Sequence, residues 1–239
     1  MGCPLHAKTV AMKTKFVVFA LMSMVLAGVL GCIEEAFAAT EVVTCFGDSI
    51  TAGWYVYAKD GNGCKPPCGG YEPALQQSLL AAGHDVVLRN YGIGGETTGE
   101  GLSRIDSVLT ASNPKYVLLL EGTNDALLSS PGTIVANLSS MIDRVLARNA
   151  TPILATLTPD NRNNGFKPIE EINSRIKTLA AEKNIAVVDL YAATTGTWNS
   201  LNSDGLHPNA AGYKLIAQTW YSQFPALGGY KPWLHLLLN

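Results

Sequence analysis

The side chains of this sequence that could do chemistry gather in four short polar segments. Ser49 follows an apolar run and stands among small residues, where its hydroxyl could act as a nucleophile. Asp204 and His207 are three residues apart, so the carboxylate could hold one imidazole nitrogen while the other takes the serine proton. Gly95 and Asn124, with the Ser49 N–H, could donate hydrogen bonds to an oxyanion. Ester hydrolysis through an acyl-enzyme requires these residue types.

Each of these residues also has a structural interpretation. Ser49 could belong to a helix cap, and Asn124 could belong to a turn. A lone histidine is more often structural than catalytic, but His207 differs from the other three histidines in the aspartate before it and Pro208 after it. Pro208 disfavours helical geometry at His207 and keeps it in a loop. The catalytic interpretation explains all four segments together.

The elements that must position these residues alternate along the chain. Almost continuously apolar runs predict buried parallel strands at residues 42–46, 86–88, 116–120, 153–157 and 186–190. Amphipathic segments predict helices at residues 72–82, 101–109, 134–147, 169–182 and 210–221. Strand and helix alternate five times, so we expect an α/β fold with three layers, α/β/α. The sequence alone leaves the strand order open.

The polar segments fall at the carboxyl ends of the predicted strands, where ligands bind in this class of fold. Ser49 follows the first strand, Gly95 the second and Asn124 the third. The turn with Asp204 and His207 comes after the fifth strand and before the last helix. A polar loop at residues 160–167 could edge the same site.

The four segments resemble the four sequence blocks of the SGNH, or GDSL-type, hydrolases. Order and spacing match over roughly residues 41–224 for Gly-Asp-Ser49-Ile, Asn-Tyr-Gly-Ile-Gly-Gly95, Gly-Thr-Asn124-Asp and Asp204-Gly-Leu-His207-Pro. The resemblance to the small single-domain members implies a five-stranded parallel, flavodoxin-like sheet and a Ser49–His207–Asp204 triad. It also implies an oxyanion hole from the Ser49 backbone, Gly95 and Asn124. The first block reads Gly-Asp-Ser-Ile-Thr and so departs from the usual leucine.

We therefore expect a serine esterase that needs no cofactor and acts on a small ester or acyl-lipid substrate. Members of the family include lysophospholipases, thioesterases, arylesterases and carbohydrate deacetylases, and these substrates stay open. Trp54 and Tyr55 could wall a substrate pocket or could equally be core residues. An acyltransferase would carry the same triad, and a catalytically idle ligand-binding lipoprotein is the alternative from another class.

Composition excludes several other functions. Only 15% of the residues are charged and the net charge is −2, which excludes the strongly basic surface of a typical nucleic-acid binder. The glycine-rich segment at residues 92–97 has Thr97 where a dinucleotide fingerprint needs its third glycine, and it follows the wrong strand. We expect one domain at residues 41–227, preceded by a leader at 1–40 and followed by an apolar tail at 228–239.

The N-terminal segment predicts export. Two lysines after Met12, a candidate start, precede an apolar run at residues 16–30 that is short for a membrane span and typical of a secretory signal. Cys32 ends a sequence similar to a lipoprotein box and would then be lipidated and membrane-attached. Cleavage after Ala38 would instead release a soluble protein, and an uncleaved anchor is a third alternative.

The remaining cysteines differ in their surroundings. Cys64 and Cys68 lie in a loop rich in glycine and proline, where they could form a disulfide in an oxidising compartment. No further metal ligands stand near them in the sequence, which disfavours a metal site. Cys45 lies in an apolar strand pattern and is predicted to be a buried free thiol.

Overall fold

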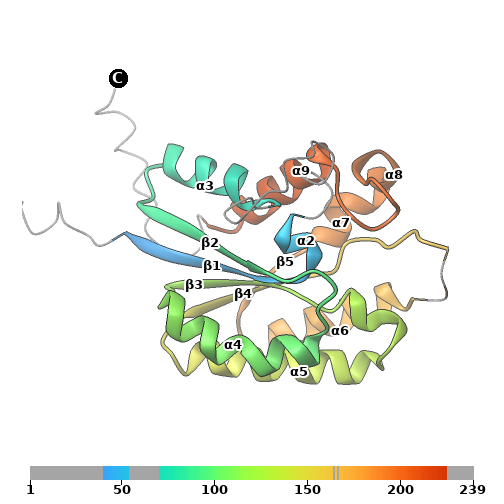
Figure 1. The fold of residues 1–239 in the computed structure, drawn as a ribbon, viewed down its shortest axis with the longest axis horizontal. Coiled ribbons are helices and arrows are strands. Elements are labelled where there is room, and N and C mark those ends of the chain that lie inside the picture. Colours follow the sequence, from blue (N-terminus) through green and yellow to red (C-terminus); the bar gives the residue numbers. More distant parts are fainter. Residues whose placement is uncertain (1–39, 54–69, 164, 166, 225–239) are drawn as a thin grey trace, which may run out of the picture. The chain divides into compact units, whose positions relative to one another are not determined.

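A computed structural model of the protein describes residues 40–53, 70–163, 165 and 167–224. Five parallel strands form one sheet in the order β2-β1-β3-β4-β5 (Figure 1). Their bounds are β1 Glu41–Gly47, β2 Val86–Gly92, β3 Tyr116–Leu120, β4 Thr151–Ala155 and β5 Ala186–Val188. This order is the flavodoxin-like one, with its switch point between β1 and β3.

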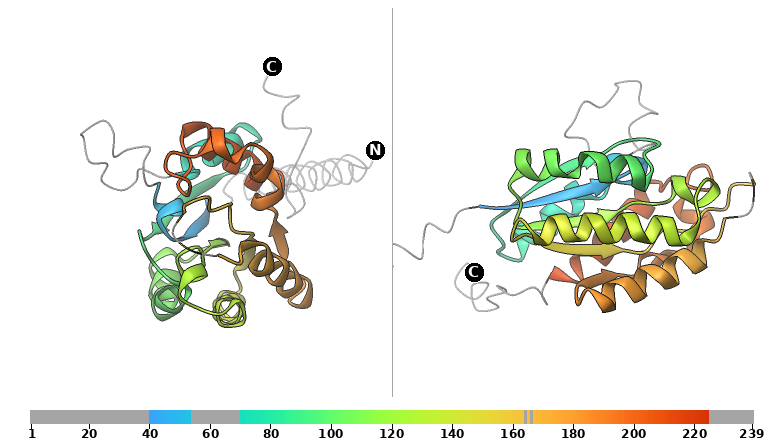
Figure 2. Two further views of the ribbon diagram at one scale, coloured as in Figure 1. Left: turned by 90° about the vertical axis from the view of Figure 1, so that its right-hand side faces the viewer. Right: turned by 90° about the horizontal axis from the view of Figure 1, so that it is seen from below.

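Helices cover both faces of the sheet (Figures 1 and 2). On one face lie α3 Glu72–Ala81, α7 Leu190–Thr194 and α9 Ala210–Tyr221. On the other face lie α4 Thr98–Ser112, α5 Pro131–Leu146 and α6 Ile169–Glu182. The predicted three-layer α/β/α architecture is confirmed.

Strand β3 shows why the apolar runs are continuous. Its side chains alternate between the two hydrophobic cores: Leu118 and Leu120 pack with the α3 and α9 side, and Val117 and Leu119 pack with the α4 and α5 side. All four are at most 1% exposed. A strand buried on both faces favours apolar side chains at successive positions, so the period-two alternation of a half-exposed strand is absent.

Several predicted boundaries are correct and others are wrong. The helices at 169–182 and 210–221 and the strand at 116–120 have the bounds expected. Strand β2 was predicted too short, because Arg89 and Asn90 interrupt its apolar pattern although the ladder with β1 continues to Gly92. Strand β4 begins two residues earlier than predicted, and β5 is shorter.

Helix α4 also begins earlier than its apolar spacing predicted. Thr97 caps it in a capping box with Glu100: each side chain accepts a hydrogen bond from the backbone N–H of the other residue. The structure further contains short helices that have no long periodic pattern to announce them. These are α2 Ser49–Ala52, η2 Asn124–Leu127, η3 Thr195–Thr197 and α8 Trp198–Leu201.

Register brings the carboxyl ends of three adjacent strands level with one another. Gly47 at the end of β1 is aligned with Gly92 of β2 and with Leu120 of β3. The segments that follow these strands therefore emerge side by side at one rim of the sheet. Among the described residues, no helix is long and apolar enough to cross a membrane.

Cys45 lies in the middle of β1 and is a buried free cysteine, as predicted. Burial raises the pKa of its thiol well above the ordinary value, and the nearby Glu72 carboxyl acts in the same direction. A thiol kept protonated in this way is a poor nucleophile.

Candidate active site

Ser49 is the first residue of the short helix α2, directly after the turn that ends β1. Asp48 caps this helix through a 2.8 Å hydrogen bond from the Ile50 N–H, so capping and placing the serine are done by the same turn. Gly47 leaves room for the close approach of β3 at the end of β1, because a Cβ there would lie 2.1 Å from the Leu120 carbonyl oxygen. Burial raises the pKa of the Asp48 carboxyl to about 7.

His207 is held in a small closed turn ahead of α9. An isolated bridge between Asn202 and Pro208 closes the turn, and Asp204 Oδ1 accepts hydrogen bonds from the Leu206 and His207 N–H groups at 3.0 and 2.8 Å. Asp204 Oδ2 lies 2.8 Å from His207 Nδ1. A carboxylate there selects the ring form that carries its proton on Nδ1 and leaves Nε2 as an acceptor.

The His207 imidazole contacts Ser49, a residue far from it in the sequence. His207 Nε2 lies 2.9 Å from Ser49 Oγ, a contact between residues 158 positions apart. Partial burial alone would raise the pKa of Asp204, but hydrogen bonds from the backbone N–H and ring of His207 lower it below the ordinary value. The Asp204 carboxylate is therefore charged at neutral pH, as an orienting group for a histidine base must be.

The Ser49–His207 contact opens into a cavity of about 330 Å³. Its described lining comprises Ser49, Gly94, Gly95, Asn124, Arg162, Leu206 and His207. The cavity therefore brings together Ser49, Gly95, Asn124 and His207, four of the residues that the sequence singled out. Gly95 has φ +82°, a left-handed conformation that favours glycine.

The sequence matches a known family over most of its length. The model of the GDSL-like lipase/acylhydrolase family matches residues 45–215. The chain belongs to this family. The predicted SGNH-type membership is thus confirmed, and the chain is a carboxylic ester hydrolase of the class in which a Ser-His-Asp triad is typical.

Two curated proteins and one solved structure illustrate the relationship to other GDSL-like acylhydrolases. The chain is 29% identical over 211 residues to an arylesterase of Vibrio mimicus, covering 86% of this chain and 95% of that protein. It is 27% identical over 194 residues to thioesterase 1/protease 1/lysophospholipase L1 of Escherichia coli, covering 80% and 86%. A crystal structure of a lipase/acylhydrolase from Enterococcus faecalis superposes with a TM-score of 0.68 at 29% identity, covering 80% and 98%.

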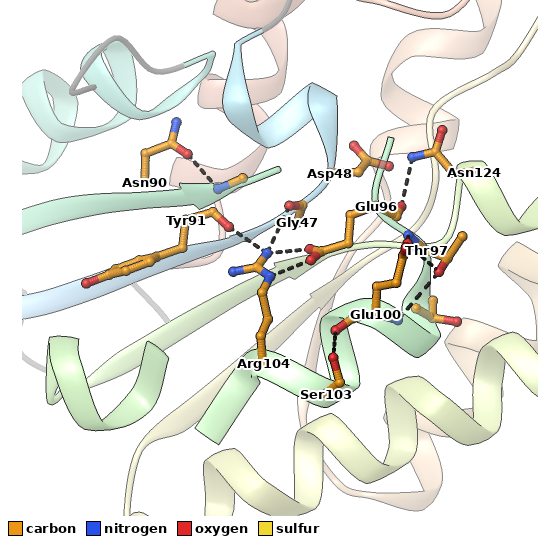
Figure 3. Close-up of polar contacts among 12 residues, drawn as sticks. Gly47, Asp48, Asn90, Tyr91, Glu96, Thr97, Glu100, Ser103, Arg104 and Asn124 are labelled. Carbon is orange, nitrogen blue, oxygen red and sulfur yellow. Dashed lines mark hydrogen bonds and ion pairs between the residues drawn. The ribbon is translucent and has the colours of Figure 1, made fainter. Parts of the chain in front are cut away.

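A buried ion pair supports one wall of the site in this GDSL-like acylhydrolase (Figure 3). The Arg104 guanidinium of α4 pairs with the carboxylate of Glu96, whose side chain is only 4% exposed. Arg104 Nη2 also donates to the Tyr91 carbonyl at 2.8 Å, and its guanidinium lies 4.0 Å above the Phe46 ring. Arg104 thereby ties the segment that follows β2 to the ends of β1 and β2.

That wall is joined to the segment after β3. The Asn124 side-chain amide donates to the Glu96 carbonyl at 2.8 Å. Asp125 accepts from the Thr98 hydroxyl and N–H at 2.6 and 2.8 Å. The interpretation of Asn124 and Asp125 as mere turn residues is incomplete, because both fix the position of the neighbouring segment.

The outcome for the other predicted site residues is mixed. Trp54 and Tyr55, with the cysteines Cys32, Cys64 and Cys68, lie outside the described residues. The loop at 160–167 does edge the cavity, through Arg162. No pattern in the sequence singles out Arg162 or the pair Glu96 and Arg104. The only signal for Glu96 is its place next to Gly95, and a charge beside a turn is too common to be informative.

Proposed function

We propose that this chain cleaves carboxylic esters through an acyl-enzyme on Ser49. The observation that carries the proposal is the pair of contacts at His207: 2.9 Å from Nε2 to Ser49 Oγ and 2.8 Å from Nδ1 to Asp204 Oδ2. Both distances are short enough for hydrogen bonds, and the three groups have the order nucleophile, base, orienting carboxylate.

In the first step Ser49 Oγ attacks the ester carbonyl and its proton passes to His207 Nε2. The carbonyl oxygen becomes an oxyanion, which the Ser49 N–H, the Gly95 N–H and the Asn124 amide stabilise. The bond to the alcohol then breaks, and His207 returns the proton to the leaving oxygen. Asp204 stabilises the imidazolium without taking its proton. A water molecule then attacks the acyl-enzyme by the same steps, and the carboxylic acid is released.

For the substrate we propose a broad class of esters and not one compound. The cavity of about 330 Å³ is at the small end of ligand sites, which favours a short acyl chain. The printed names of the relatives, arylesterase and thioesterase 1/protease 1/lysophospholipase L1, support short acyl esters, thioesters and lysophospholipids as substrates to test. An acyl-enzyme could also pass its acyl group to an alcohol, so acyltransfer and carbohydrate deacetylation belong to the same test.

We also propose that the protein is exported. Its basic and apolar leader supports this, with Cys32 as the lipidation candidate and cleavage after Ala38 as the alternative. Metabolic labelling with a fatty acid would mark the full chain and not a Cys32→Ser variant if Cys32 is lipidated. Equal labelling of the two, or labelling of neither, contradicts lipidation.

The activity itself is tested with p-nitrophenyl esters of increasing acyl length, using the protein beside Ser49→Ala and His207→Ala. We expect the unmutated protein to hydrolyse these esters and the two variants not to. Ester cleavage retained in Ser49→Ala would contradict the mechanism. A fluorophosphonate probe should label the unmutated protein at Ser49. Absence of both labelling and hydrolysis would favour a ligand-binding protein.

A further inference from the structure

Arg162 brings a permanent positive charge to the candidate active site. It lies in the loop between β4 and α6 and lines the same cavity as Ser49 and His207. Among the described lining residues, it is the one that is charged at every physiological pH. Its side chain is 30% exposed and lines the cavity, so it is accessible to a ligand there.

The guanidinium is held by an ion pair with Asp160, whose side chain is completely buried. Arg162 Nε donates to Asp160 Oδ1 at 3.0 Å and Nη2 donates to Oδ2 at 2.8 Å. The Arg162 N–H also donates to Oδ1 at 3.0 Å. These bonds hold the planar group in one orientation, and Nη1 has no hydrogen-bond partner within the part of the chain that the structure describes.

The buried carboxylate does not cancel the charge of the cluster. Lys167 Nζ lies 3.6 Å from Asp160 Oδ2, and its side chain is only 4% exposed. Asp160, Arg162 and Lys167 therefore comprise two cations and one anion. Of the three, only Arg162 lines the cavity, so the group that a substrate meets is the cation.

Other carboxylates near Arg162 are occupied by different donors. Asp204 accepts from His207 and Leu206, and Asp48 accepts from the Ile50 N–H. Neither lines the cavity in the described structure. The hydrogen bonds to Asp160 raise the pKa of Arg162, and the charges of Asp204 and Asp48 act in the same direction, so the guanidinium keeps its proton.

We propose that Arg162 binds an anionic group, a carboxylate or a phosphate, that the ester substrate carries near its scissile bond. This inference rests on the proposed esterase function and narrows its substrates to charged esters. A guanidinium with free N–H groups recognises such oxyanions through directed, charge-assisted hydrogen bonds. The anion could belong to the acyl part or to the alcohol part, and these two sources are separated by experiment.

The test compares matched neutral and anionic esters. On the acyl side, the p-nitrophenyl monoester of adipate is compared with p-nitrophenyl hexanoate. On the alcohol side, the butyrate ester of a carboxylated nitrophenol is compared with p-nitrophenyl butyrate. The readout is the ratio of kcat/KM for the anionic ester to kcat/KM for its neutral partner. In Arg162→Gln this ratio should fall at least about tenfold for one pair, because a hydrogen bond to a charged group is lost.

Three further variants control for folding and for charge. Asp160→Asn combined with Arg162→Gln removes the guanidinium without leaving a buried carboxylate next to an uncharged side chain, and it should show the same fall. Arg175→Gln removes an arginine from an exposed pair with Glu171 on α6 and should leave the ratio unchanged. Arg162→Lys should keep part of the preference, since it retains the charge and loses the planar group.

The outcomes separate this inference from the esterase function. If the unmutated protein cleaves both esters of each pair and Arg162→Gln leaves both ratios unchanged, the inference is overturned and the function stands. If no ester is cleaved, calorimetric titration with adipate and with glycerol phosphate decides. Binding that disappears in Arg162→Gln supports the anion site, and absence of binding to the unmutated protein overturns it.

Discussion

The side-chain amide of Asn124 donates a 2.8 Å hydrogen bond to the backbone carbonyl of Glu96 (Figure 3). Asn124 follows β3 and Glu96 follows β2, so this bond joins two of the segments that line the cavity. It uses one of the two amide hydrogens and fixes the plane of the amide. Within the part of the chain that the structure describes, the second hydrogen has no partner, as the proposed role of Asn124 as an oxyanion donor requires.

Replacing Asn124 by alanine should lower kcat by about 10²- to 10³-fold with little change in KM, because the lost donor acts mainly on the transition state. Steady-state kinetics with a p-nitrophenyl ester measure both constants. Asn124→Asp should lose more activity, since it puts a carboxylate where the oxyanion forms. An unchanged kcat in Asn124→Ala would remove Asn124 from the proposed oxyanion hole.

Asp204→Asn separates orientation of the histidine from folding of its turn. The new side chain can keep Oδ1 as acceptor for the Leu206 and His207 N–H groups, but it offers an amide where Oδ2 faced Nδ1. That favours the wrong ring form of His207, and kcat should fall by about 10³- to 10⁴-fold. Thermal unfolding of the variant should stay close to that of the unmutated protein. Activity within tenfold of the original would contradict the role of Asp204.

The Arg104–Glu96 pair should contribute to stability and activity together. Arg104→Met leaves the buried Glu96 carboxylate without its guanidinium, which should lower the free energy of unfolding by about 3 kcal/mol. Urea denaturation measures this change. Without urea, kcat should fall as well, because Glu96 belongs to the segment after β2 that contains Gly95 and that accepts the hydrogen bond from Asn124.

A matched control is available on α6. Arg175 pairs with Glu171, but both side chains are about half exposed. Arg175→Met should therefore cost no more than about 0.5 kcal/mol. Adding Glu96→Gln to Arg104→Met should recover part of the lost stability by removing the unpaired charge. Equal losses in Arg104→Met and Arg175→Met would show that burial of the pair has no energetic consequence.

Glu72 should make the stability of the protein depend on pH. Burial raises the pKa of its carboxyl from 4.5 to about 8, so the folded state holds a proton that the unfolded state releases between these values. Stability from this group is present below pH 4.5 and is lost as the pH rises toward 8. The contribution changes by about 3 kcal/mol between pH 5 and pH 8.

Glu72→Gln carries no titrating group and removes this contribution. Unfolding by urea at both pH values should show a smaller loss of stability with rising pH in the variant than in the unmutated protein. Other buried carboxyls, such as Asp48, remain in both proteins and cancel in the difference. Parallel stability curves for the two proteins would contradict a raised pKa at Glu72.

The features that could be predicted from the sequence are those that a short stretch of chain fixes by itself. The buried strands have apolar runs, and helices α6 and α9 have clear spacing and ends. Asp204 and His207 belong to one turn, so their contact follows from local geometry. Their meeting with Ser49 could be expected only because strand ends converge in a parallel α/β fold.

What could not be predicted depends on packing between distant segments. Arg104 lies on α4 and has the pattern of an ordinary surface charge, yet the adjacent strand ends bury its contact with Glu96. Arg162 lies in a polar loop, where no hydrophobic periodicity predicts which way a side chain points. The orientation of its guanidinium comes from hydrogen bonds to the buried Asp160. The ladder that carries β2 through Arg89 and Asn90 likewise exists only because β1 lies beside it.

The separation of 158 residues between Ser49 and His207 has a consequence for how the enzyme is made. The proposed nucleophile Ser49 and the oxyanion candidates Gly95 and Asn124 are all synthesised before α5, whereas the proposed base His207 arrives with the turn before α9. A growing polypeptide can complete β1, β2 and β3 and still have no general base. On the proposed mechanism, hydrolysis begins only when the turn before α9 reaches Ser49, so the onset of esterase activity reports the docking of that turn.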